Sequence, residues 1–225
     1  MYEFKINGRD MKDSGPSVDV YESLKNKIET GSLSPSQNLR EVDLAHQYKV
    51  SRNTIKKALL MLERDTLVSI EMNKGAKVRS YSLEEVLEFL ELRSELEGFI
   101  IRLACVVLSE TDIQNMESIL NEMRELKNQQ ELVLYSHNNQ KFHQIIYDAC
   151  PNKTATKLLI NLKNQMKKYN TKTILIPKRS DQSFKEHEDI FNAVKNGSCL
   201  EAQALMITHI MNVRKIFEKN YQLLL

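Results

Sequence analysis

Three of the five histidines in this 225-residue chain fall on the apolar face of a different expected helix. His143, His187 and His209 each have large apolar residues at helical spacing around them, whereas His46 and His137 lack this pattern. A buried imidazole needs a polar partner. Three neutral imidazoles that converge, together with solvent, form a sound ligand set for a divalent cation.

Asn139 lies one helical turn before His143 and adds a neutral donor on the same face. The pattern therefore indicates a metal site made of three histidines, with Asn139 as a weaker fourth ligand. Zn²⁺ suits imidazole best, and Ni²⁺ or Mn²⁺ are the other candidates. The residues alone equally allow three separate core histidines, each satisfied by its own hydrogen bond.

A helical body is needed to position these side chains. Ser82 is a good N-cap, and apolar residues follow it at helical spacing to about Ala104. A longer loop is expected over 171–182. No strand pattern persists in residues 81–225, so an all-helical bundle is expected there. Further helices are expected at about 111–129, 131–149, 153–170, 183–196 and 199–222.

Residues 18–80 form a different pattern, preceded by an N-terminal extension over 1–17. One helix ends near Gly31, a short helix covers about 40–47, and a third helix follows the N-cap Ser51. Two short strands, 67–70 and 76–79, come next, with Lys74 and Gly75 at the bend between them. This order is typical of a winged helix-turn-helix, whose third helix enters the major groove of DNA.

Basic residues gather at the start of the third helix of this head. Lys49, Arg52, Lys56 and Lys57 fall within nine residues that contain no acid. Arginine can hold guanine through two hydrogen bonds, while lysine mostly contacts phosphates. Residues 1–80 carry 14 basic and 11 acidic residues, and residues 81–225 carry 18 and 19. This distribution favours a local DNA-binding patch over a polybasic protein.

The cysteines and the apolar stretches indicate the cellular compartment in which the protein works. Cys105, Cys150 and Cys199 are odd in number and widely spaced, so we expect three small buried thiols in a reducing cytoplasm and no disulfide framework. The N-terminus lacks a signal core. The stretch Phe99–Leu108 is interrupted by Arg102 and is too short for a membrane span. We therefore expect a cytoplasmic protein with no membrane partner.

Three motifs in the head resemble the DNA-binding domain of GntR-family bacterial regulators. They are Leu39-Arg40-Glu41-x-x-Leu44-Ala45, Val50-Ser51-Arg52-Asn53-Thr54-Ile55-Lys56-Lys57-Ala58-Leu59 and Lys74-Gly75-x-Lys77-Val78. Lys56 stands where the family commonly has arginine, which keeps the charge without the fork geometry. The resemblance implies DNA contacts at Arg40, Arg52, Lys56, Lys74 and Gly75. We also expect Asn53, Thr54 and Lys57, at the start of the same helix, to bind DNA.

The body resembles the FCD ligand-binding domain of the FadR-type GntR subfamily. The motifs are Glu91-Leu-Arg93-x-x-Leu96-Glu97, Asn139-x-x-x-His143, Glu186-His187 and His209. This resemblance implies a divalent metal on the three histidines, with Asn139 in place of an aspartate. It also implies that Arg93 meets a carboxylate effector. From the residues alone, Arg93 could equally form an ion pair with Glu97, one turn away.

We therefore expect a transcriptional regulator and no enzyme. It would bind a two-fold-symmetric operator as a homodimer and respond to a small organic acid. One alternative is a metal-dependent hydrolase or lyase fused to a helix-turn-helix. The other is a DNA-binding dimer without an effector. Against the enzyme, no nucleophile or acid–base set accompanies the histidines, and Glu186 and Glu188 should point off the core face.

Overall fold

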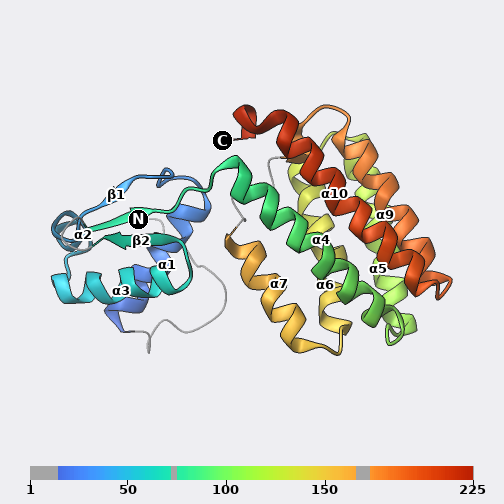
Figure 1. Cartoon of the computed structure of the whole chain (residues 1–225), viewed down its shortest axis with the longest axis horizontal. Coiled ribbons are helices and arrows are strands. Elements are labelled where there is room, and N and C mark those ends of the chain that lie inside the picture. Colours follow the sequence, from blue (N-terminus) through green and yellow to red (C-terminus); the bar gives the residue numbers. More distant parts are fainter. Residues whose placement is uncertain (1–14, 72–74, 166–172, 225) are drawn as a thin grey trace. The chain divides into compact units, whose positions relative to one another are not determined.

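The computed structural model describes residues 15–71, 75–165 and 173–224. The chain divides between Ser80 and Tyr81 into two compact units, each with its own hydrophobic core (Figure 1). We call residues up to Ser80 the head and residues from Tyr81 the body. The expected fold class, a winged helix-turn-helix followed by a helical bundle, is confirmed.

The head consists of three helices and a small antiparallel sheet. α1 (Pro16–Glu29) and α2 (Glu41–Tyr48) both pack on α3 (Arg52–Arg64). The turn between α2 and α3 contains Lys49, which has φ +54°. The buried residues Leu24, Ile55 and Leu62 fill the space between the helices. Burial on only one face leaves the opposite face of α3 to solvent.

The sheet of the head has the strand order β1-β3-β2. β2 (Val68–Glu71) and β3 (Gly75–Val78) form the expected hairpin, and β1 (Asn38–Leu39) adds a two-residue strand that was not expected. Gly75 has φ +89°, a backbone conformation that strains residues with a side chain, so glycine is favoured at this position. Lys74, the other expected wing residue, lies outside the described residues.

The body is built from long helices. They are α4 (Leu83–Cys105), α5 (Glu110–Asn128), α6 (Leu132–Ala149), α7 (Lys153–Gln165), the 3₁₀ turn η1 (Thr173–Leu175), α9 (Arg179–Lys195) and α10 (Cys199–Leu224). Ser82 accepts a hydrogen bond from the Glu85 amide, and the Glu85 carboxylate accepts one from the Ser82 amide. This capping box fixes where α4 begins.

One helix begins well before its expected start, and the expected end of another is not tested. α9 begins at Arg179, four residues before the expected start at 183. The structure describes α7 only to Gln165, so the expected extension to 170 lies outside the described residues. No helix of the described residues is long and apolar enough to cross a membrane.

α4 and α10 lie side by side along much of the body (Figure 1). Gly98 makes this close approach possible, because a Cβ at that position would lie 2.6 Å from Ile207 Cγ1. The absence of a side chain lets the two helices come nearer than any larger residue would allow.

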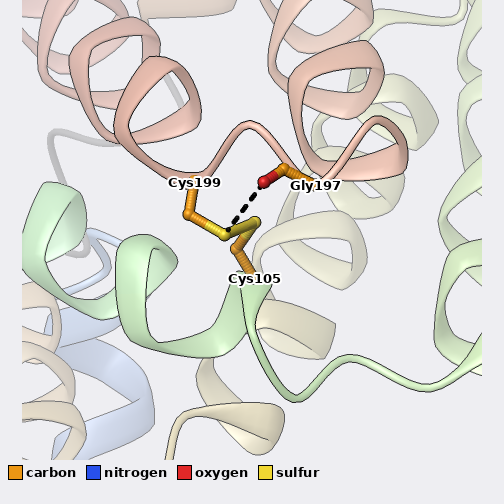
Figure 2. Close-up of a disulfide and its surroundings, with 3 residues drawn as sticks. All are labelled: Cys105, Gly197 and Cys199. Atoms are coloured by element: carbon orange, nitrogen blue, oxygen red, sulfur yellow. Dashed lines mark hydrogen bonds between the residues drawn. A yellow bond between two sulfur atoms is a disulfide. The ribbon is translucent and has the colours of Figure 1, made fainter.

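The expectation of three unpaired thiols is wrong for two of the cysteines. Cys105 ends α4, Cys199 begins α10, and the two form a disulfide with a Cα–Cα distance of 5.5 Å (Figure 2). Cys150 is buried and free, as expected. The pair was missed because 94 residues separate its members, and only the packing of α4 on α10 brings them together.

Candidate metal centre and DNA-reading helix

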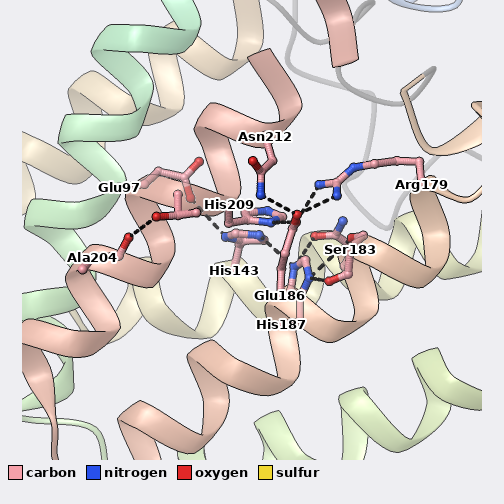
Figure 3. Close-up of polar contacts among 11 residues, drawn as sticks. Glu97, His143, Arg179, Ser183, Glu186, His187, Ala204, His209 and Asn212 are labelled. Carbon is pink, nitrogen blue, oxygen red and sulfur yellow. Dashed lines mark hydrogen bonds and ion pairs between the residues drawn. The ribbon is translucent and has the colours of Figure 1, made fainter. Parts of the chain in front are cut away.

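Three helices of the body each bring one histidine to a common centre. His143 lies on α6, His187 on α9 and His209 on α10, and all three are buried (Figure 3). Each offers a ring nitrogen, and these ligand atoms lie within 4.8 Å of one another. The Nε2 atoms of His143 and His187 are 3.2 Å apart. This spacing suits three ligands of one ion.

The Nδ1 atom of each histidine faces an acceptor (Figure 3). His187 Nδ1 donates to the Ser183 carbonyl oxygen at 2.6 Å, and His209 Nδ1 donates to Glu186 Oε2 at 2.6 Å. His143 Nδ1 lies 3.0 Å from Glu97 Oε2. For His187 and His209 these acceptors favour the tautomer with the ring proton on Nδ1, which leaves Nε2 with a lone pair.

The donors fit a divalent cation. Two lone pairs 3.2 Å apart repel each other unless a positive charge lies between them. Burial lowers the pKa of His143 to about 4 and holds the pKa of His187 well below its ordinary value, so the buried rings disfavour a proton. A metal ion binds the neutral form of imidazole.

Asn139 lies at the edge of the same centre. Its Oδ1 is 3.1 Å from His187 Nε2, and the side chain is half-buried. The amide is therefore placed with the three imidazoles and provides a neutral oxygen where a carboxylate would provide a charged one. Neutral oxygens are weaker ligands than carboxylates for a divalent ion.

Glu186 points into the site, so the expectation that it points away is wrong. Its carboxylate accepts hydrogen bonds from Arg179 at 2.9 and 2.8 Å, from Asn212 at 2.9 Å and from His209 (Figure 3). Burial alone would raise the pKa of Glu186, but the hydrogen bonds from His209 and Arg179 lower it to about 2. Glu188, by contrast, faces outward to Arg124.

The orientation of Glu186 was wrongly predicted because α9 contacts a second helix. We judged Glu186 by the face of α9 that carries His187, but α10 covers the neighbouring face as well. Two sequence separations could have indicated the contacts of Glu186 with Arg179 and Asn212. Arg179 precedes Glu186 by seven residues, which is two helical turns, and Asn212 follows His209 by three.

A second charged cluster lies on the other side of His143. Glu97 accepts hydrogen bonds from Arg93 Nε at 2.6 Å and from the Tyr147 hydroxyl at 2.8 Å. Lys163 Nζ in turn donates to the Tyr147 oxygen at 2.8 Å. Burial alone would raise the pKa of Glu97, but the charges of Arg93 and Lys163 hold it well below its usual range. From the sequence, only the Arg93–Glu97 pair was expected.

A cavity of about 240 Å³ opens beside the histidines. Arg93, His143 and His209 line it, so Arg93 both pairs with Glu97 and faces the cavity. The other described lining residues are Ser136, Asn139, Gln140, Gln144, Tyr147, Ile160, Lys163, Asn164, Thr173, Ile174, Arg179, Ser183 and Val213. Polar groups around a small concave site, with some apolar wall, are the usual form of a small-molecule pocket.

In the head, α3 presents the expected DNA-reading residues to solvent. Its N-cap Ser51 accepts a hydrogen bond from the Thr54 amide at 3.1 Å, and the two hydroxyls also bond, so Thr54 is partly occupied by the cap. The side chain of Arg52 is 69% exposed and lies 3.5 Å from Glu41. The remaining exposed residues of the predicted set are Arg40, Asn53, Lys56 and Lys57.

A winged helix-turn-helix with a basic outer face, followed by a helical body with its own core, defines a DNA-binding transcriptional regulator. The chain belongs to the GntR family of bacterial regulatory proteins and carries an FCD domain. Residues 16–78 match the family described as bacterial regulatory proteins, gntR family, and residues 88–212 match the FCD domain.

Similar proteins are regulators of the same kind. The HTH-type transcriptional regulator LutR of Bacillus subtilis is 28% identical over 87% of this chain and 100% of its own length. The HTH-type transcriptional repressor GlaR of Escherichia coli is 23% identical over 90% of this chain and 96% of its own length. These relatives and domains identify a transcriptional regulator and not an enzyme.

Solved structures share the fold. The E. coli protein McbR/YncC is 18% identical, with a TM-score of 0.72 over 92% of this chain and 99% of that one. A GntR regulator from Rhodococcus is 19% identical, with a TM-score of 0.66 over 91% and 98%. At these identities the likeness extends to the fold alone.

Proposed function

We propose that this regulator binds one divalent metal per chain through His143, His187 and His209, with Asn139 as a weak fourth ligand. The observation that carries the proposal is the set of three Nδ1 acceptors, which turn three unprotonated Nε2 atoms toward one point. Zn²⁺ is favoured by imidazole ligation, with Ni²⁺ or Mn²⁺ next. The metal would act as a Lewis acid that attracts an anionic oxygen.

The effector is a small organic acid that occupies the cavity beside the histidines. Its carboxylate binds at the metal and near Arg93, which lines the cavity. Arg93 lies on α4, and only four residues, 79–82, separate β3 of the head from the start of α4. The acid regulates by binding one arrangement of the two heads better than another.

Residues 18–80 act as the DNA-binding domain and residues 81–225 as the effector-binding and dimerisation domain, after an extension over 1–17. The protein works in the cytoplasm as a homodimer on a two-fold-symmetric operator, because one recognition helix covers only a few base pairs. The exposed basic face of α3 supports this role.

Metal analysis tests the centre directly. The purified wild-type protein should hold one divalent ion per chain. His187→Ala should lower metal affinity by at least about 10-fold, because the loss of a group that merely orients a ligand already costs that much. The matched control is His137→Ala, an exposed histidine on the same helix as His143. Equal metal content in wild type and His187→Ala would reject the site.

A second variant works in the opposite direction. Asn139→Asp should tighten metal binding, because a charged carboxylate replaces the neutral amide next to His187. Competition with a chromogenic chelator measures the difference. An unchanged affinity would remove Asn139 from the ligand set.

The DNA-reading role of α3 is tested at Arg52. Arg52→Ala should weaken binding to a cognate operator by roughly 1–3 kcal/mol, because a base or phosphate contact is lost. Arg64→Ala, at the other end of α3, is the control. Fluorescence anisotropy at several salt concentrations gives both affinities and should show a steep salt dependence. Wild-type affinity for Arg52→Ala would refute the assignment.

Effector coupling requires a change in DNA affinity. Organic acids that raise the melting temperature of the metal-loaded protein should also shift operator affinity by roughly 5–150-fold, the usual range for coupled sites. Chelation of the metal should abolish both effects. Acids that stabilise the protein and leave operator affinity unchanged would contradict the sensor function.

A further inference from the structure

The disulfide joins the ends of two helices of the body. Cys105 is the last residue of α4 and Cys199 is the first residue of α10, and each is partly exposed (Figure 2). The third cysteine, Cys150, is fully buried and free. In the cytoplasm, where the proposed function places this protein, a disulfide is usually transient and senses the redox state. An accessible pair of this kind is therefore a candidate for reversible oxidation.

The two helix ends affect a thiolate in opposite ways. The N-terminus of a helix carries partial positive charge, and the C-terminus carries partial negative charge. When the bond is open, the sulfur of Cys199 lies at the positive end of α10, whereas the sulfur of Cys105 lies at the negative end of α4. A helix N-terminus stabilises a thiolate, and the thiolate is the nucleophilic form of cysteine. Cys199 should therefore be more reactive than Cys105.

Neighbouring groups leave this difference in place. Glu201, two residues after Cys199, is exposed to solvent, which screens its carboxylate. The Gly197 carbonyl oxygen lies 3.5 Å from Cys199 Sγ and opposes a thiolate only weakly, because a thiol is a weak donor. Arg102, one turn before Cys105, extends its guanidinium over the ring of Phe99, 5.6 Å from the ring centroid. This charge is thus directed towards the preceding turn of α4, away from Cys105.

The fold keeps the two sulfurs within reach of each other. The Cα atoms of Cys105 and Cys199 are 5.5 Å apart, within the range that disulfide geometry requires. Ala104, which precedes Cys105, and Ala202, one turn after Cys199, are fully buried in the same core, where α4 packs on α10. The bond can therefore close without a rearrangement of the backbone.

We infer that Cys105 and Cys199 form a reversible thiol switch that a hydroperoxide closes, with Cys199 as the attacking thiol. The Cys199 thiolate attacks one oxygen of the hydroperoxide and the O–O bond breaks. Cys199 becomes a sulfenic acid, and an alcohol leaves, or water in the case of hydrogen peroxide. The Cys105 thiol then attacks the Cys199 sulfur, the S–S bond forms and water leaves.

The electrons balance in both directions of the switch. On closing, the two thiols lose two electrons and two protons, which reduce the hydroperoxide to the alcohol and water. On opening, a dithiol reductant of the thioredoxin type attacks the bond, returns two thiols and is itself oxidised to a disulfide. Closure joins α4, which contributes Arg93 to the cavity wall, covalently to α10, which contributes His209.

The first experiment counts thiols. The full chain is reduced with dithiothreitol, freed of the reductant and treated with a small excess of hydrogen peroxide. Thiols titrated under denaturing conditions should fall from three to one, that of Cys150, and dithiothreitol should restore three. Three thiols after the treatment, or a loss through bonds between chains on a non-reducing denaturing gel, would overturn the switch.

The second experiment identifies the attacking thiol. Cys105→Ser keeps Cys199, whose sulfenic acid should persist and be labelled by dimedone. Cys199→Ser keeps Cys105, which should be labelled at least about threefold more slowly, because a tenfold smaller thiolate fraction is partly offset by higher nucleophilicity. The buried Cys150, present in both variants, is the internal control. Melting curves against reduced wild type verify that both variants are folded.

The outcomes separate this inference from the proposed function. Labelling of Cys105 as fast as that of Cys199 would overturn the assignment of Cys199 as the attacking thiol. Neither readout depends on a bound metal or acid. Failure of the switch would therefore leave the metal-and-acid site standing, and failure of that site would leave the switch standing.

Discussion

Glu97→Ala should lower the free energy of unfolding by about 3–5 kcal/mol, because it removes one partner of a buried ion pair. The carboxylate is 1% exposed and is shared by Arg93, Tyr147 and the His143 ring. Without it, the buried guanidinium of Arg93 loses the carboxylate with which it forms an ion pair. Urea denaturation, followed by circular dichroism, measures the loss.

The control for this prediction is Glu95→Ala. Glu95 is exposed on the same helix, so its removal should change stability by at most about 0.5 kcal/mol. Similar losses for the two variants would mean that Glu97 does not organise the buried cluster. A second consequence is measurable as well. Glu97→Ala should weaken metal binding, because His143 loses the acceptor that orients its ring.

Reduction of the Cys105–Cys199 disulfide should destabilise the body by about 4–5 kcal/mol, the loop-entropy value for a closed loop of this length. The bond spans 94 residues of sequence. Denaturation with and without dithiothreitol measures the difference. In a reducing cytoplasm the bond would open, so the stability of the body depends on its surroundings.

The control is the double variant Cys105→Ser, Cys199→Ser, whose stability should not respond to dithiothreitol. Titration of thiols under denaturing, non-reducing conditions provides an independent check. One free thiol, that of Cys150, is expected. Three free thiols in protein purified without reductant would contradict the pairing.

The long helices, and the buried faces that carry the three histidines, could be predicted from the sequence. The starts of α4 and α3 could be predicted from the N-cap residues Ser82 and Ser51, because capping involves only a few neighbouring residues. Each of the three histidines could be assigned to a buried face from its apolar neighbours alone, since the helical period is fixed. The two-residue β1 was missed because so short a strand has no period.

Contacts between distant helices could not be predicted in the same way. Glu186 was judged from α9 alone, and its true partners, Arg179 and Asn212, depend on where α9 begins and how α10 covers it. Cys105 and Cys199 pair for the same reason. Lys163 reaches Tyr147 only because α7 packs beside α4 and α6 places the phenol there.

The missing side chain at Gly98 determines which part of the body can move. α4 touches α10 so closely there that a single methyl group would collide with Ile207, and the disulfide fastens the C-terminal end of α4 to the start of α10. Sliding or rotating one helix against the other is therefore blocked along this seam. A ligand that displaces α4 must therefore carry α10 with it, so the two helices move as one unit.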